Sequence, residues 1–425
     1  MIDRVLHTPE GVRDIYNAEC ERKLYLEQKL HQVFKTYGFR DIETPTFEFF
    51  DVFSKERGTV ASKDMYKFFD RDGNTLVLRP DITPSIGRCI AKYYKNESYP
   101  IRLCYKGNVF INNSSYQGKL KETTQLGVEL MNDDTVDADA QMIALSINCL
   151  LEAGLKEFQI ELGHADFFKG IIEEAGFNEE EEEQLRLRIE DKNLFGVEEL
   201  LETKCLSSDL KKVFSMLPSL FGTKDKLELA KTLTNNSRAL QGIKRLEDIY
   251  DILSLYDFEK YVSFDLGMLS KYNYYTGIIF RAYTYGTGDA ILGGGRYDHL
   301  LGQFGKEAPA IGMAIIVDQL MMALTRQKLI LQPENTNTLI LYIINYRKEA
   351  ITLACQFRSE GMNIETYQVT GEIELEAFLS YAKEHCIGGL LILEDEDVIK
   401  VVTTDTKEVQ TLRLSAVLQT KEESL

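Results

Sequence analysis

The chain has 425 residues, 44% of them hydrophobic and 27% charged, so it is long enough for two or three domains. Its 67 acidic and 49 basic residues give a net charge of −18, which argues against a nucleic-acid partner, although it also serves simple solubility. No apolar run is long enough for a transmembrane helix, and the N-terminal segment lacks a signal-peptide core. Seven cysteines without CxxC or CxxH spacing predict free, mostly buried thiols, no metal and a cytoplasmic location.

The first part of the chain alternates segments of helical and strand character. Apolar residues at helical spacing predict helices over residues 19–37, 82–94 and 137–153. Strands are predicted over 39–45, 101–110, 123–131 and 158–162, and a hairpin over 64–78. Residues 168–257 are acidic, helical and poor in strand formers, and therefore predict a helical insertion.

The second part returns to strands and then changes at a linker. Strands are predicted at 262–265 and 277–285, followed by a glycine-rich turn at 293–295 that opens into a helix, and by a strand and a helix over 310–324. The polar, proline-containing segment 331–338 is typical of a linker. Beyond it, strands and helices alternate and predict a small α/β domain with mainly parallel pairing. The expected organisation is one domain over 1–330 and a second over 339–425.

Four segments carry residue types suited to a small polar ligand. They are LRPDIT at 78–83, YKGNVF at 105–110 with TQLGVE at 124–129, NYYTG at 273–277 and GGGRYD at 293–298. Asp81 and Glu129 can accept hydrogen bonds from a cation, and Thr83 and Gln125 offer neutral hydrogen bonds. Tyrosines give flat apolar walls, and glycines let the backbone approach a ligand closely. Taken singly, these residues have simpler explanations, such as a helix N-cap for Asp81 or a turn for the glycines.

In this order, the four segments resemble the histidyl-tRNA synthetase family of class II synthetases, over roughly residues 7–325. The resemblance implies an α+β fold, in which a class II aminoacyl-tRNA synthetase-like antiparallel sheet is flanked by helices and carries the helical insertion. The small C-terminal α/β domain resembles an anticodon-binding domain loosely. A pocket for histidine is also implied, without cofactor or catalytic residues. The residues expected to bind histidine are Asp81, Thr83, Gln125, Glu129, Tyr274, Tyr275, Gly294, Arg296 and Tyr297.

The resemblance fails at the positions that would hold ATP. Where the family carries arginines and an acidic residue, this chain has Ile111, Asn113, Ser270 and Gln319. A hydrogen bond to a charged group is worth about 1.5–3 kcal/mol, so three lost arginine contacts remove roughly 4.5–9 kcal/mol of transition-state stabilisation. Lys271 is a poor substitute, because its flexible stem offers no planar fork. Aminoacylation is therefore not expected.

A chain that retains the residues of the histidine pocket but lacks those of the ATP site is similar to the regulatory subunits of short-form ATP phosphoribosyltransferase. That resemblance implies a non-catalytic subunit acting in the first step of histidine biosynthesis, within a complex that is a glycosyltransferase. The implied partners are the short catalytic subunit, which this subunit would activate, and histidine as a feedback inhibitor. This chain would form a homodimer within a hetero-octamer, and no membrane is expected as a partner.

Three alternatives stay open at this point. An active histidyl-tRNA synthetase with unusual motifs is disfavoured by Ile111, Ser270, Gln319 and the net charge. A stand-alone sensor or RNA-binding pseudo-synthetase is kept open by the C-terminal domain, although its acidic loop at 394–397 suits a phosphate backbone poorly. A metal enzyme is disfavoured because the five histidines form no HxH or HxxxH pair.

Overall fold

The computed structural model describes residues 6–54, 60–113, 119–190, 193–202, 204, 206–268, 275–329, 337–395 and 397–419. By its internal contacts the chain divides into two compact units, Met1–Asp14 with Leu26–Ile330 and Ile15–Tyr25 with Leu331–Leu425. Among the described residues, no helix combines the length and the apolar character that a membrane crossing requires.

The larger unit is built on a nine-stranded sheet in the order β1-β5-β6-β12-β11-β10-β7-β9-β8. Its strands are β1 (Arg40–Asp41), β5 (Ile101–Phe110), β6 (Glu122–Met131), β7 (Phe158–His164), β8 (Phe221–Gly222), β9 (Val262–Asp265), β10 (Ile278–Thr284), β11 (Leu292–Arg296) and β12 (Ala310–Ile316). Neighbouring strands pair antiparallel, except that β1 runs parallel to β5 and β7 to β9. This sheet, with helices beside it, confirms the predicted α+β class.

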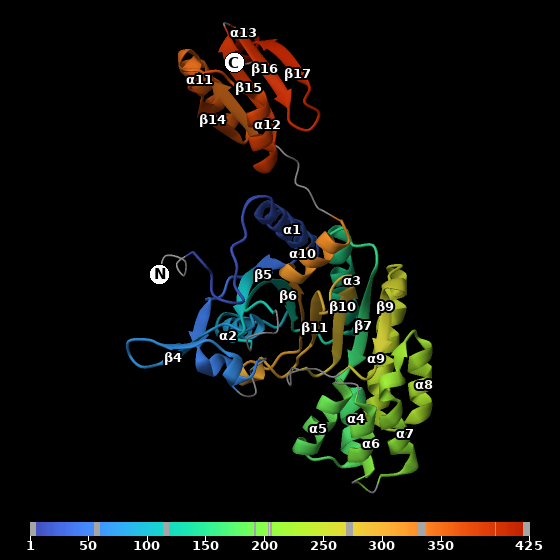
Figure 1. Ribbon diagram of the computed structural model, residues 1–425. Coiled ribbons are helices and arrows are strands. Elements are labelled where there is room, and N and C mark those ends of the chain that lie inside the picture. Colours follow the sequence, from blue (N-terminus) through green and yellow to red (C-terminus); the bar gives the residue numbers. More distant parts are fainter. Residues whose placement is uncertain are drawn as a thin grey trace. The chain divides into compact units, whose positions relative to one another are not determined.

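Helices pack on both faces of the large sheet. On one face, α2 (Thr83–Tyr93) directs Ile86 and Ile90 into a core that also contains Leu103 of β5 and Leu300. On the other side, α3 packs on β12 and α10 packs on β6 and β12, and α9 packs on β7 (Figure 1). The bounds of these helices are α3 (Val136–Glu152), α9 (Ser237–Leu255) and α10 (Val317–Arg326). Helix α1 (Asn17–Thr36) belongs to the second unit up to Tyr25 and to the larger unit from Leu26. The face under α2 is the one that holds the pocket described below.

A second, three-stranded sheet in the order β2-β4-β3 lies in the first part of the chain. Its strands are β2 (Phe47–Phe49), β3 (Lys67–Phe69) and β4 (Thr75–Leu78). β3 and β4 form the predicted hairpin, whose turn is fixed by Asp70, because its Oδ1 accepts from the backbone N–H of Asp72 at 2.9 Å and of Asn74 at 2.8 Å.

The predicted helical insertion is a group of helices that ends with α9 (Figure 1). Its other members are α4 (Ala165–Ala175), α5 (Glu179–Glu190), α6 (Leu194–Glu202), α7 (Ser208–Met216) and α8 (Asp225–Leu233). Side-chain caps begin several of them: Ser207 accepts from Leu210 N, and Asn236 accepts from Arg238 N and Ala239 N. The two-residue strand β8 within this segment was not predicted. Short 3₁₀ helices occur at Phe50–Phe53, Ser62–Asp64, Leu217–Ser219, Glu259–Tyr261, Gly302–Phe304 and Ile344–Tyr346.

The second unit contains a five-stranded sheet in the order β14-β13-β15-β16-β17. Its elements are β13 (Asn337–Tyr342), α11 (Arg347–Ser359), β14 (Ile364–Gln368), α12 (Leu375–Glu384), β15 (Ile387–Asp395), β16 (Val398–Thr403), β17 (Val409–Arg413) and α13 (Leu414–Gln419). β13 pairs parallel with β14 and β15, whereas β15, β16 and β17 pair antiparallel. The prediction of mainly parallel pairing is therefore right for only one half of this sheet. β16 begins three residues after β15 ends, too soon for the crossover that parallel strands need, and β17, which was not predicted, pairs antiparallel with β16.

Three local predictions are wrong. Residues 293–295 lie inside strand β11 and not in a turn, and the next helical element after it is the 3₁₀ helix at Gly302–Phe304. The predicted strand over 39–45 is reduced to Arg40–Asp41, since Pro45 has no N–H to donate to a ladder. Of the six described cysteines, only Cys104 and Cys149 are buried, so the thiols are not mostly buried.

Candidate ligand-binding site

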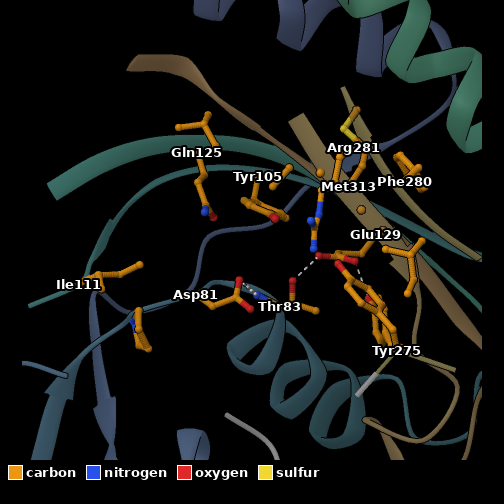
Figure 2. A pocket seen from close by; sticks show the side chains of 18 residues that line it. Asp81, Thr83, Tyr105, Ile111, Gln125, Glu129, Tyr275, Phe280, Arg281 and Met313 are labelled. Atoms are coloured by element: carbon orange, nitrogen blue, oxygen red, sulfur yellow. Dashed lines mark hydrogen bonds between the residues drawn. The ribbon is translucent and has the colours of Figure 1, made fainter. Parts of the chain in front are cut away.

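A pocket with a volume of about 130 Å³ lies on the face of the large sheet that carries α2 (Figure 2). Seven residues that the sequence predicted as ligand contacts line it together. They are Asp81, Thr83, Gln125, Glu129, Tyr275, Gly294 and Tyr297. They come from the start of α2, from β6 and β11, and from the segments just before β10 and after β11, so the pocket gathers parts of the chain that are distant in sequence.

Glycines of the sheet form much of the floor of the pocket. The ring of Tyr105 occupies the space that a β-carbon on Gly127 would fill, and the carboxyl group of Glu129 does the same at Gly312. At Gly295, an added β-carbon would stand 2.8 Å from Cδ1 of Tyr275. Each of these three glycines, on β6, β12 and β11, thus lets a polar or aromatic side chain lie flat on the strands.

Glu129 is the most deeply buried acid of the pocket, with 1% of its surface exposed. Thr83 Oγ1 donates a hydrogen bond to its Oε1 at 2.8 Å, and the Tyr297 hydroxyl donates a short one to Oε2. Burial raises the pKa of Glu129 to about 8, against the opposing effect of these two hydroxyl donors. The side chain therefore holds a proton through much of the neutral range, and a ligand that brings a positive charge or an N–H group favours its ionised form.

Two further acceptors face the same space. Asp81 Oδ1 accepts from the backbone N–H of Ile82 at 2.7 Å and of Thr83 at 3.3 Å, so Asp81 is held just before the start of α2 while it lines the pocket. Gln125 Oε1 is buried and has no hydrogen-bond partner in the part of the chain that the structure describes. Acceptors of this kind suit an ammonium group, which has three N–H bonds to donate.

Aromatic side chains enclose the ligand space. Tyr105 and Tyr297 are buried, and burial raises the pKa of both phenols well above the ordinary value, with the nearby Glu129 adding to the effect. Both tyrosines are therefore neutral hydrogen-bond donors at any physiological pH. Lys169 of α4 donates to the backbone carbonyl of Tyr275 at 3.3 Å, which ties this wall to the helical insertion.

Arg296, which the sequence predicted as a ligand contact, does not line the pocket. Adjacent residues of a strand point to opposite faces, and Gly295 faces the pocket, so Arg296 points away from it. There its Nη2 lies 2.6 Å from Oδ1 of Asp139, which is fully buried on α3 and also pairs with Arg245 at 2.7 Å. Arg296 is a structural residue of the opposite face of the sheet.

Of the positions where the residues that contact ATP are expected to be replaced, some line the pocket and others do not. Ile111 lines the pocket with an apolar side chain. Asn113 Nδ2 donates to Leu120 O at 3.2 Å, and Gln319 lies in α10; neither is among the lining residues. Ser270 and Tyr274 lie outside the described residues.

The sequence did not single out several lining residues. They are Tyr105, Ile279, Phe280, Arg281, Gly312, Met313, Ala314 and Ile316, whereas the lining residues Pro80 and Gly293 lie within the quoted segments LRPDIT and GGGRYD. Tyr105 lies within the quoted segment YKGNVF, and most of the others lie two residues apart on β10 and β12. Side chains alternate between the two faces of a strand, and this alternation could have grouped these residues in the sequence. It identifies the face that holds the pocket only once the strand register is known.

Comparison with known proteins defines the class. Residues 11–320 match the histidyl-tRNA synthetase family. A solved histidyl-tRNA synthetase from Nostoc sp. PCC 7120 has a TM-score of 0.79 at 20% identity, covering 98% of this chain and 99% of that one, and therefore shares the fold. The chain is a histidyl-tRNA synthetase-like protein, as its motifs indicated.

Relatives of higher sequence identity show to which family within this class the chain belongs. A curated ATP phosphoribosyltransferase regulatory subunit from Acetivibrio thermocellus is 41% identical, covering 99% of this chain and 100% of its own length. Another from Ruminiclostridium cellulolyticum is 42% identical over 93% of this chain and 94% of its own. A crystal structure from Bacillus halodurans, described as an ATP phosphoribosyltransferase regulatory subunit/histidyl-tRNA synthetase, has a TM-score of 0.80 at 32% identity, covering 91% of this chain and 97% of that one. The chain belongs to the family of ATP phosphoribosyltransferase regulatory subunits, which confirms the sequence-based assignment.

Proposed function

We propose that the pocket binds histidine, and that its occupancy makes the ATP phosphoribosyltransferase catalytic subunit responsive to histidine. The observation that carries the proposal is the set of acceptors around one small space. Asp81 and Gln125 suit the ammonium group of an amino acid, and Glu129, held by Thr83 and Tyr297, suits an imidazole N–H. Tyrosine rings supply flat walls for the imidazole.

Feedback requires more than binding. Histidine must bind two states of the complex with different affinity, since a ligand with equal affinity for both shifts nothing. A coupling free energy of about 1–3 kcal/mol is sufficient for useful inhibition. The hydrogen bond from Lys169 on α4 to the backbone of Tyr275 is one contact through which ligand binding in the pocket can change the position of the helical insertion.

The same pocket is poorly suited to activating histidine with ATP. Ile111 brings an apolar side chain where the synthetases carry an arginine, and phosphate groups need cations placed on them. Asn113, Ser270 and Gln319 likewise stand where the synthetases carry charged residues that contact ATP. We therefore propose that the subunit has no aminoacylation activity and no catalytic residues of its own.

The assembly we propose is a homodimer of this chain within a hetero-octamer with the short catalytic subunit, in the cytoplasm. The C-terminal unit, from β13 onward, is proposed to be the counterpart of an anticodon-binding domain without a tRNA to bind, given the net charge of −18.

The test is the activity of a short catalytic subunit from the same organism, alone and with this protein, across a histidine titration. Activity that rises on mixing and falls with histidine supports the proposal. Glu129→Gln should remove the histidine response without removing the rise, whereas the exposed Glu157→Gln serves as a matched control. No effect on activity and no complex by size-exclusion chromatography would sink the proposal, and charging of tRNA by the pure protein would establish a synthetase instead.

A further inference from the structure

The pocket contains a positive charge that the sequence motifs do not account for. Among the described residues that line it, Arg281 is the only lysine or arginine. It lies on β10, one residue after Phe280 and two residues after Ile279, and its side chain is partly buried. Figure 2 shows Arg281 entering from the sheet, whereas Asp81 enters from the loop before α2.

The strand register places Arg281 between Glu161 of β7 and a row of small residues. Across β10, β11, β12 and β6 the row reads Arg281, Gly293, Ala314, Gly127, and it ends at Tyr105 on β5. Glu129 lies on β6, two residues from Gly127 and on the same face. Three strand spacings of about 4.8 Å therefore separate the strand of Arg281 from the strand of Glu129 by about 14 Å.

The middle of that row is open. An added β-carbon on Gly293 would meet nothing nearer than the carbonyl oxygen of Phe280 at 3.9 Å, whereas the glycines at 127, 295 and 312 are each covered by a neighbouring side chain. The ligand space therefore lies over Gly293 and Ala314. Arg281 borders it on one side, and the acidic and hydroxyl groups around Glu129 border it on the other.

We propose that Arg281 receives the carboxylate of the bound amino acid. This inference rests on the proposed function, since it assumes that histidine is the ligand. A zwitterion needs acceptors for its ammonium group and a donor for its carboxylate, and the guanidinium of arginine matches a carboxylate with two parallel N–H bonds. Ser270 stands where the synthetases carry an arginine, whereas Arg281 on β10 brings a cation to the pocket from a position eleven residues further along the chain.

The experiment is isothermal titration calorimetry of the full chain with L-histidine and with L-histidinol. Histidinol keeps the ammonium group and the imidazole but has a hydroxymethyl group in place of the carboxylate. The wild-type protein is expected to bind histidine at least about 10-fold more tightly than histidinol. Arg281→Met should weaken histidine binding by about 10- to 100-fold and histidinol binding by less than about 3-fold. Arg281→Lys should keep part of the discrimination, and the exposed Arg347→Met on α11 should change neither ligand.

The outcomes separate the two proposals. Failure of the wild-type protein to bind histidine overturns the proposed function, and the role of Arg281 with it. Histidine binding that is tight in wild type and unchanged in Arg281→Met overturns only the role of Arg281. An equal loss for both ligands also overturns it, because it would mean that the arginine shapes the pocket and does not meet the carboxylate. If Arg281→Met does not fold, the lysine variant and the wild-type comparison of the two ligands decide, and equal affinity for both ligands overturns the role.

Discussion

The carboxyl group of Glu129 lies over the α-carbon of Gly312, in the space that a β-carbon would fill. We expect Gly312→Ala to push this carboxyl group away from Thr83 and Tyr297, because the added carbon overlaps Oε2. Losing good geometry in two buried hydrogen bonds should lower the free energy of unfolding by about 1–3 kcal/mol. Chemical unfolding checks the stability, and calorimetry with histidine should show weakened binding.

Gly293 provides the matched control on the same floor. Its β-carbon position is open, and its φ lies outside the left-handed region, so Gly293→Ala should fold with stability within about 0.5 kcal/mol of wild type. The new methyl group would still intrude on the proposed ligand space and weaken histidine binding. Equal losses of stability in the two alanine variants would contradict this view of the floor.

The pKa of Glu129 makes stability depend on pH in a defined direction. Burial raises this pKa from 4.5 to about 8, so between these values the folded protein keeps a proton that the unfolded chain releases. The corresponding stability is fully present below pH 4.5 and is lost as the pH rises through 8. Glu129→Gln cannot titrate. The unfolding free energy of wild type minus that of the variant should therefore fall between pH 5 and pH 8, by up to about 4 kcal/mol.

Denaturant unfolding of both proteins at several pH values measures that difference. Subtracting the unfolding free energy of the variant removes the contributions of the other carboxylates. Asp70 is one example: its hydrogen bonds to Asn74 lower its pKa, so its contribution to stability rises with pH and does not fall. A difference that stays constant across this range would mean that Glu129 is ionised in the folded protein.

Thiol reactivity tests the burial of the cysteines. Burial, with a contribution from the neighbouring Asp41, raises the pKa of Cys104 to about 12, and burial also raises the pKa of Cys149. Since the thiolate is the reactive form, neither should react with a disulfide reagent at pH 8, whereas the exposed Cys355 should. Peptide mass spectrometry of the labelled native protein gives the answer, and the denatured chain should label at all seven cysteines. Rapid labelling of Cys104 would contradict its burial on β5.

Much of the fold and part of the site could be predicted from the sequence. The long strands β5 and β6 and helix α3 follow from apolar patterns that tertiary contacts do not override. The sequence motifs also identified seven residues of the pocket. The strand identity of residues 293–295 could not be predicted, because a glycine run normally weakens a strand, and this one is held by pairing with β10 on one side and β12 on the other.

Arg281 and Arg296 show why the rest of the site required the structure. Arg281 lies six residues after Tyr275 and Arg296 lies directly before Tyr297, and both offer a guanidinium to an anion. Which of them faces the pocket depends on the strand register, since a shift of one residue moves every side chain to the other face. No composition or spacing signal separates them. The register places Arg281 on the pocket face and Arg296 against Asp139.

The role of Arg296 gives the last prediction. Replacing Arg296 with methionine leaves the fully buried Asp139 with Arg245 as its remaining arginine partner. Breaking a buried ion pair from one side costs about 3–5 kcal/mol, so Arg296→Met should lower the free energy of unfolding by about that amount. Arg238→Met is the matched control, because Arg238 pairs with Asp166 at 2.7 Å in a more exposed setting and should cost about 1 kcal/mol or less. If Arg296 instead contacted the ligand, the methionine variant would keep its stability and lose affinity for histidine, and denaturant unfolding together with calorimetry distinguishes the two results.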